Sequence, residues 1–218
     1  MLGKLLQQAH PHQALLESAE LWRRSAQILR LPAQVPVLKL DEPTESFESL
    51  GPFAIGRYDE LRPTLYQAEL FTQSGAEPRC VHMGLDIGAP VGAELFAWTD
   101  SVVYAQGALA SQGDYGHALV LESAIICSGA ELKLWSLYGH LSADSLSVHA
   151  VGERVKRGEL IGRLGATHEN GGWPPHVHFQ LSWLPPEGFD LPGVTSRTDR
   201  QRGLWTFPDP RLVLGPLY

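Results

Sequence analysis

The chain of 218 residues has only two cysteines, Cys80 and Cys127, which form neither a disulfide framework nor a cysteine-based zinc motif. It also lacks a run of about 18 apolar residues, so the sequence predicts no membrane-spanning helix. Lysine and arginine (17) are outnumbered by aspartate and glutamate (24), and the net charge is -7. With no cluster of basic residues, this balance argues against a nucleic-acid surface.

The start of the chain, "MLGKLLQQAHPHQALLESAELWRR", has no apolar core segment and no cleavage site of small residues. It therefore does not resemble a signal peptide, and taken at face value the sequence predicts a cytoplasmic protein. A trimmed chain would look the same.

What the chain does contain is typical of a globular protein with many turns. Hydrophobic residues make up 44% and charged residues 19%, which argues against disorder. The length allows one domain with additions or two small domains. The 22 glycines and 16 prolines are too many for a helical bundle and indicate β structure.

Residues 12–31 repeat apolar side chains at Leu15, Ala19, Trp22, Ala26 and Leu29. This spacing predicts an amphipathic helix that ends at Pro32 and packs on the rest of the molecule. Residues 32–79 are punctuated by proline and predict a connector, whose last part is compatible with a short helix. We expect residues 1–79 to form this helix and connector and to pack on the core, and residues 80–218 to form a β domain with a C-terminal tail.

Short β-type segments follow residue 80, separated by glycine, aspartate and serine. They are "LFAWTDSVVYAQG", "HALVLESAII", "LKLWSLYGHL" and "VHFQLSW". The glycines of "VGERVKRGELIGRLGAT" suit strands joined by tight turns. The fold class predicted is mainly β.

Histidines and one aspartate in this part of the chain have the spacing of a metal site. His176 and His178 are two residues apart, so they share one face of a strand. His82 and Asp86 share a face too, but in a flat strand their Cα atoms would be about 13 Å apart. A shared metal ion requires a bend between them, and Gly84 permits one. Two histidines with Asp86 would leave the fourth position of a zinc ion open, as in catalytic sites.

Zinc-dependent hydrolysis also needs a proton acceptor. No HExxH motif occurs, so the glutamate of that class is missing. His140, in "LWSLYGHLS", follows an apolar strand, and a neutral histidine can accept a proton near pH 7.

Three of these segments, "HMGLDIGAPVG", "LYGHLS" and "PPHVHFQL", resemble in order the signatures of the lysostaphin-type, or LytM-like, zinc metallopeptidases. The resemblance covers roughly residues 80–182. It implies an antiparallel β-sheet or sandwich core with a narrow groove that has one zinc ion on its floor. It also implies His82, Asp86 and His178 as zinc ligands, with His140 and His176 as the catalytic pair beside them.

The resemblance further implies an endopeptidase that acts on peptides, above all on peptidoglycan crosslinks containing glycine or D-alanine, and a location in the cell envelope. The N-terminal segment and the tail also resemble peptidase-like domains fused to aminotransferase and small-molecule kinase domains. A binding or regulatory module with the same fold, an amidase acting on a small intracellular substrate, and a purely structural zinc domain therefore remain alternatives.

Several neighbouring residues have two interpretations. Cys80 could bind zinc, but a packed apolar side chain is the favoured reading. Tyr115 and Trp173 are either groove or core residues, and His117 is either a groove or a turn residue. His10, His12, His149 and His168 have no evident partner and are expected to be solvated.

Overall fold

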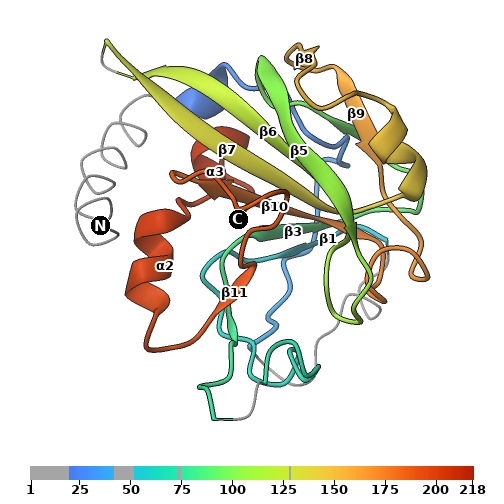
Figure 1. The fold of residues 1–218 in the computed structure, drawn as a ribbon, viewed down its shortest axis with the longest axis vertical. Coiled ribbons are helices and arrows are strands. Elements are labelled where there is room, and N and C mark those ends of the chain that lie inside the picture. Colours follow the sequence, from blue (N-terminus) through green and yellow to red (C-terminus); the bar gives the residue numbers. More distant parts are fainter. Residues whose placement is uncertain (1–19, 42–51, 73–74, 128) are drawn as a thin grey trace.

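A computed structural model describes residues 20–41, 52–72, 75–127 and 129–218. Its main element is a seven-stranded antiparallel sheet, which confirms the mainly β prediction (Figure 1). In order across the sheet the strands are β1 (Ala54–Gly56), β3 (Leu85–Gly88), β10 (His176–Ser182), β7 (Ala130–Leu141), β6 (Gly116–Cys127), β5 (Ser101–Leu109) and β8 (Arg154–Val155).

Smaller elements complete the fold. Two two-stranded sheets pair β2 (Val81–His82) with β11 (Val194–Thr195), and β4 (Glu94–Phe96) with β9 (Leu160–Arg163). The helical elements are short: η1 (Leu21–Arg23), η2 (Ala143–Ser147), α2 (Arg200–Thr206) and α3 (Arg211–Leu214). Figure 1 shows β5, β6 and β7 as long strands and α2 on the left of the view.

No helix in the described part of the chain has both the length and the apolar character needed to cross a membrane.

The central sheet is packed on both faces because its strands alternate between two apolar clusters. In β10, Val177, Phe179 and Leu181 point into the larger cluster, where they meet Leu85 of β3 and Tyr138 of β7. The second cluster lies on the opposite face and includes Val120, Leu137, Tyr115, Met83 and Cys80. His176, His178 and Gln180 alternate with the core residues of β10, so this second face also carries the histidines.

The helix expected over residues 12–31 does not form over residues 20–31, the part of this range that the structure describes. Residues 12–19 lie outside the described residues, and from residue 20 onward only η1 forms before the chain turns irregular. The backbone of this stretch bonds to another segment instead, because Ala26 N donates to Trp98 O and Phe96 N donates to Ile28 O. Ile28 and Leu29 are still buried in the larger cluster. In residues 20–31 the apolar spacing therefore reflects burial against the core and not a helix.

The connector contributes a strand to the main sheet. β1 pairs with β3, with Gly56 opposite Asp86, and therefore lies at the edge of the seven-stranded sheet. Residues 57–72 form turns rather than a short helix. The domain boundary predicted at residue 80 stays a prediction. The pairing of β1 with β3 joins residues on its two sides.

Phe179 offers a test of which face of β10 is core. It is fully buried and its ring centroid lies 5.0 Å from that of Tyr138. We expect Phe179→Ala to lower the free energy of unfolding by about 3–5 kcal/mol, measured by urea denaturation. The control is Ile126→Ala, since Ile126 is 55% exposed and its truncation should change stability by less than about 0.5 kcal/mol. Equal losses in the two variants would contradict this packing.

Candidate metal and catalytic site

The pairing of β10 with β3 places a histidine opposite a carboxylate. His178 is the cross-strand partner of Asp86, and His176 is that of Gly88. Both histidines lie on the face of β10 that points away from the larger core cluster, because Val177 and Phe179 occupy the other face. The same-face placement predicted from the two-residue spacing is confirmed.

His82 reaches the same place because the strand that carries it breaks before Asp86. β2 ends at His82 and β3 begins at Leu85, with Met83 and Gly84 between them. The break brings His82 Nε2 to 3.2 Å from Asp86 Oδ1. Gly84 at this break leaves room for the ring of His178, since a Cβ there would lie 2.4 Å from that ring.

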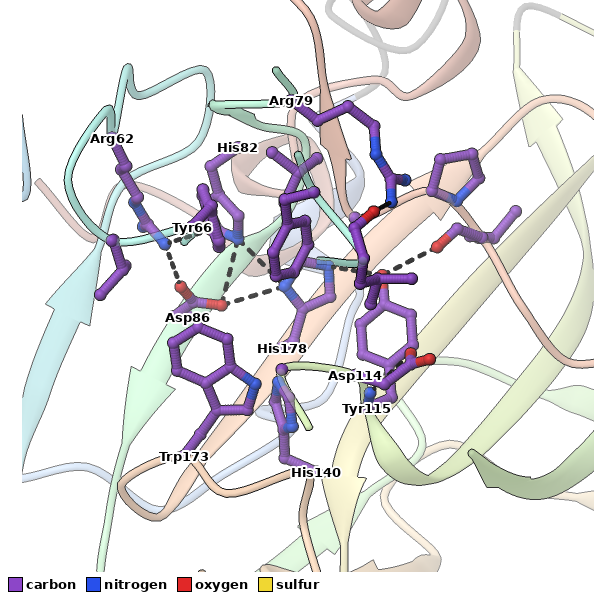
Figure 2. Close-up of a pocket in the computed structure, with 18 of the residues that line it drawn as sticks. Arg62, Tyr66, Arg79, His82, Asp86, Asp114, Tyr115, His140, Trp173 and His178 are labelled. Atoms are coloured by element: carbon purple, nitrogen blue, oxygen red, sulfur yellow. Dashed lines mark hydrogen bonds and ion pairs between the residues drawn. The ribbon is translucent and has the colours of Figure 1, made fainter. Parts of the chain in front are cut away.

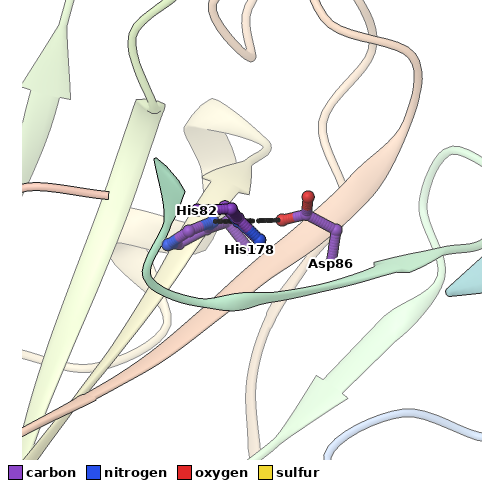
Figure 3. A group of neighbouring side chains, drawn as sticks. All are labelled: His82, Asp86 and His178. Carbon is purple, nitrogen blue, oxygen red and sulfur yellow. Dashed lines mark hydrogen bonds and ion pairs between the residues drawn. The ribbon is translucent and has the colours of Figure 1, made fainter. Parts of the chain in front are cut away.

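Three donor atoms therefore converge (Figure 3). His178 Nδ1 lies 3.0 Å from Asp86 Oδ1 and 3.0 Å from His82 Nε2. Nitrogen and oxygen ligands of a tetrahedral zinc ion at 2.0–2.1 Å are about 3.3 Å from one another, so the triangle is close to the size that zinc requires.

The tautomers of the two histidines also suit a cation. His82 Nδ1 donates to Arg57 O at 2.8 Å, which leaves Nε2 with a lone pair. His178 Nε2 donates to Gln180 Oε1 at 2.9 Å, which leaves Nδ1 with a lone pair. The orientation of the Gln180 amide follows from its Nε2, which donates to Pro192 O at 3.3 Å. Two lone pairs and a carboxylate oxygen facing one another form a donor set that fits a divalent metal ion.

A bulge turns His140 into the same pocket. The register of β6 with β7 shifts between His117 and Leu119, and His140 has a left-handed backbone with φ 63°. Tyr138 and Leu141 on either side point into the larger core cluster. The irregularity thus lets His140 face the site while its neighbours stay packed, and a non-glycine residue in this conformation is a common feature of functional sites.

His140 and His176 form a second pair beside the triangle. Their ring centroids are 4.2 Å apart. Each donates through Nδ1 to a carbonyl, His140 to Asn170 O at 2.8 Å and His176 to Pro174 O at 2.7 Å. The Nε2 atom of each ring is therefore unprotonated in the neutral form, and that of His176 lies 3.8 Å from Asp86 Oδ1.

Burial keeps these histidines neutral. Burial, together with the nearby Arg62, lowers the pKa of His82 to about 4. Burial also lowers the pKa of His140 well below its usual value, helped by His176 and His178, and it lowers the pKa of His176. Burial alone would raise the pKa of Asp86, but the positive charge of the buried Arg62 holds it well below its usual range. At neutral pH the Asp86 carboxylate is thus negative, and the imidazoles of His82, His140 and His176 are uncharged.

The five predicted residues line one pocket of about 100 Å³. Figure 2 labels His82, Asp86, His140 and His178 among the residues around it. Each of them is at most 5% exposed. Tyr115 and Trp173 line this pocket, as one of their two interpretations predicted. Cys80 packs in the second apolar cluster and does not join the candidate metal group, whereas His117 lines a neighbouring surface hollow.

Sequence reasoning missed the pocket wall that precedes residue 80. Arg62, Leu65, Tyr66 and Phe71 all line the pocket. Arg62 Nη1 donates to Asp86 Oδ2 at 2.7 Å and to Tyr66 Oη at 3.0 Å. No local pattern marks this contact, because its partners are 24 residues apart and the segment reads as a connector.

A mainly antiparallel β domain with a buried two-histidine, one-carboxylate triangle and a second histidine pair has the features of a metallopeptidase. Residues 80–187 match the family model described as Peptidase family M23. This match and the order of the three motifs place residues 80–187 in peptidase family M23.

Curated relatives share part of this region. The chain is 37% identical over 100 residues to the DD-carboxypeptidase/endopeptidase Mpg of Neisseria meningitidis serogroup B, and equally to that of Neisseria gonorrhoeae. The match covers 46% of this chain and 20% of each relative, so the chain spans about a fifth of their length.

Two solved structures align with part of the chain. The catalytic domain of the prophage-encoded M23 protein EnpA from Enterococcus faecalis is 25% identical, with 65% of this chain and 88% of that one covered and a TM-score of 0.42. The catalytic domain of lysostaphin from Staphylococcus simulans is 22% identical, with 56% and 80% covered and a TM-score of 0.37.

The lowered histidine pKa values predict acid sensitivity of the metal-free protein. The pKa values of His82, His140 and His176 lie below the unfolded value near 6.5. The unfolded chain therefore binds more protons as the pH falls below that value, and the free energy of unfolding decreases by up to about 1.4 kcal/mol per pH unit for each histidine.

The measurement is urea denaturation in the presence of a chelator, between about pH 7.5 and about pH 5. His140→Asn removes one of these groups and should give a shallower dependence on pH. A free energy of unfolding that stays constant over this range would show that the buried imidazoles are not held neutral.

Proposed function

We propose that the protein is a zinc-dependent endopeptidase that hydrolyses a peptide or amide bond in peptidoglycan crosslinks containing glycine or D-alanine. The observation that carries the proposal is the convergence of three lone-pair donors with two further neutral histidines beside them. Membership of a peptidase family and the similarity to relatives named as DD-carboxypeptidase/endopeptidase support the reaction and the substrate.

In this proposal His82 Nε2, Asp86 Oδ1 and His178 Nδ1 hold one zinc ion. When bound, zinc supplies a Lewis acid that polarises a carbonyl group and lowers the pKa of a water molecule. Gln180 and the Arg57 carbonyl fix the outer nitrogens of the two histidines, which keeps the inner nitrogens turned toward the ion. The catalytic unit is assigned to residues 80–218, with residues 1–79 packed on it.

His140 and His176 are the proton-transfer residues. Each is neutral near pH 7 and is oriented by a carbonyl at Nδ1, so its Nε2 is the atom that accepts a proton. One of the pair takes the proton from the attacking water, and the other stabilises the developing negative charge or protonates the leaving amine. The left-handed backbone of His140 fixes its direction relative to His176.

One alternative has an observation in its favour. The pocket has a volume of only about 100 Å³, and the segment that carries Leu65, Tyr66 and Phe71 forms one of its walls. This favours an amidase acting on a small substrate over cleavage of a long polymer. A binding module without turnover and a structural zinc domain lack such support, because neither needs a second pair of neutral histidines beside the metal ligands.

The division of roles predicts different effects of the two neighbouring histidines. We expect His178→Ala to lose both bound zinc and activity, because it removes a ligand. His176→Ala should keep zinc but lose about 10²–10⁴-fold in activity, the usual contribution of a proton-transfer group. Metal content and hydrolysis are measured on the same preparations, with His168→Ala as the control because His168 is exposed.

Two results would contradict these roles of His176 and His178. Equal loss of zinc in His176→Ala and His178→Ala would show that His176 is a ligand. Full activity in His176→Ala would remove it from the proton-transfer pair.

The substrate is tested by digesting whole peptidoglycan and reading the products by mass spectrometry. We expect muropeptides cut at an amide bond, lost when a chelator is added and restored by zinc. A set of small amides is assayed in parallel. Hydrolysis of small amides alone would favour the amidase, and binding without hydrolysis of either substrate would favour the binding module.

A further inference from the structure

A buried ion pair joins the candidate metal site to the segment that precedes the family-matched residues. Arg62 is 1% exposed and contacts two carboxylates, Glu60 Oε2 through Nε at 2.8 Å and Asp86 Oδ2 through Nη1 at 2.7 Å. Figure 2 shows the contact with Asp86. Arg62 lies 18 positions before the start of the family match at residue 80. The match alone therefore does not account for this contact.

Arg62 is held on every side. Its Nη1 also donates to Tyr66 Oη at 3.0 Å, its Nη2 donates to Arg57 O at 3.3 Å, and its backbone N donates to Cys80 O at 2.7 Å. Glu60 is fixed in turn by Leu40 N at 3.0 Å and by Arg57 Nε at 2.9 Å. The guanidinium thus has one position relative to Asp86.

With Arg62 in this position, the two carboxylate oxygens of Asp86 have different partners. Oδ2 accepts the bond from Arg62, while Oδ1 faces His178 Nδ1 at 3.0 Å and His82 Nε2 at 3.2 Å. Gly56 of β1 leaves the space that this requires, because a Cβ there would lie 2.7 Å from Arg62 Nη2 and 3.2 Å from Asp86 Oδ2.

Stability alone does not explain such an arrangement. The cost of removing two charges from water offsets much of the attraction within a buried pair, and apolar replacements are often as stable. What a buried bond from a guanidinium does provide is direction, since it fixes which carboxylate oxygen is available to a third group.

We propose that Arg62 is a positioning residue for the metal site: it engages Asp86 Oδ2 so that Asp86 offers Oδ1 alone to the ion. The proposal rests on the ligand role of Asp86 in the proposed function. Arg62 touches neither substrate nor reacting atoms and acts through Asp86.

The test compares Arg62→Lys with Tyr66→Phe. Lysine keeps the positive charge but cannot bridge Asp86 and Glu60, so we expect the zinc dissociation constant, measured by competition with a chelator, to rise about 10–100-fold. Tyr66→Phe removes another partner of Arg62 and leaves the bond to Asp86, so it should bind zinc like the unsubstituted protein.

A spectroscopic readout separates positioning from general stability. Cobalt(II) in place of zinc gives intense visible bands in four-coordinate sites and weak bands at higher coordination numbers. We expect intense bands in the unsubstituted protein and in Tyr66→Phe. In Arg62→Lys they should weaken, because a freed Oδ2 adds to the coordination of the metal.

A second variant keeps the proposal testable if Arg62→Lys does not fold. Arg62→Gln removes the buried charge, leaves Glu60 paired with Arg57, and should weaken the cobalt bands in the same way. Unchanged bands and unchanged zinc affinity in a folded variant would overturn the proposal, as would failure of both variants to fold, which would make Arg62 a structural residue. If the unsubstituted protein bound neither metal, the proposed function itself would fail.

Discussion

The site depends on one constraint: two imidazole nitrogens and a carboxylate oxygen, all carrying lone pairs, are held within 3.2 Å of one another. Lone pairs at this distance repel unless a cation or a proton lies between them, so only a rigid surrounding can keep them there. The outer nitrogens of His82 and His178 are fixed by an amide and a carbonyl, and the second oxygen of Asp86 is fixed by Arg62. The strands behind them are fully packed.

The sheet supplies this rigidity through local departures from regular geometry. Regular alternation in β10 puts His176 and His178 on one face and Val177 and Phe179 in the core. Regular geometry alone would leave His82 too far from Asp86 and would turn His140 into the core. The break at Gly84 corrects the first, and the bulge at His140 corrects the second. Both departures are stabilised by the strands on either side of them.

Much of this could be predicted from the sequence, and the failures have physical reasons. The spacing of His176 and His178 fixes their shared face, and Gly84 marks where the chain bends. The resemblance named all five residues that meet in the pocket. Over residues 20–31, the described part of the helix expected at 12–31, only η1 forms, because apolar spacing is satisfied equally by an irregular segment whose backbone bonds to Trp98 and Phe96. Arg62 was missed because an ion pair between residues 24 positions apart leaves no periodic or local signal.

The bond between Arg62 and Asp86 also sets the smallest piece of this chain that could be transplanted. A chimera joined at residue 80 would carry all three motifs of the family and the five residues of the pocket. It would nevertheless bury Asp86 with one oxygen unpaired, and an unpaired buried carboxylate either takes up a proton or rotates toward another donor. A recipient scaffold would therefore have to bring its own cation to the back of the aspartate before the grafted histidines could meet it.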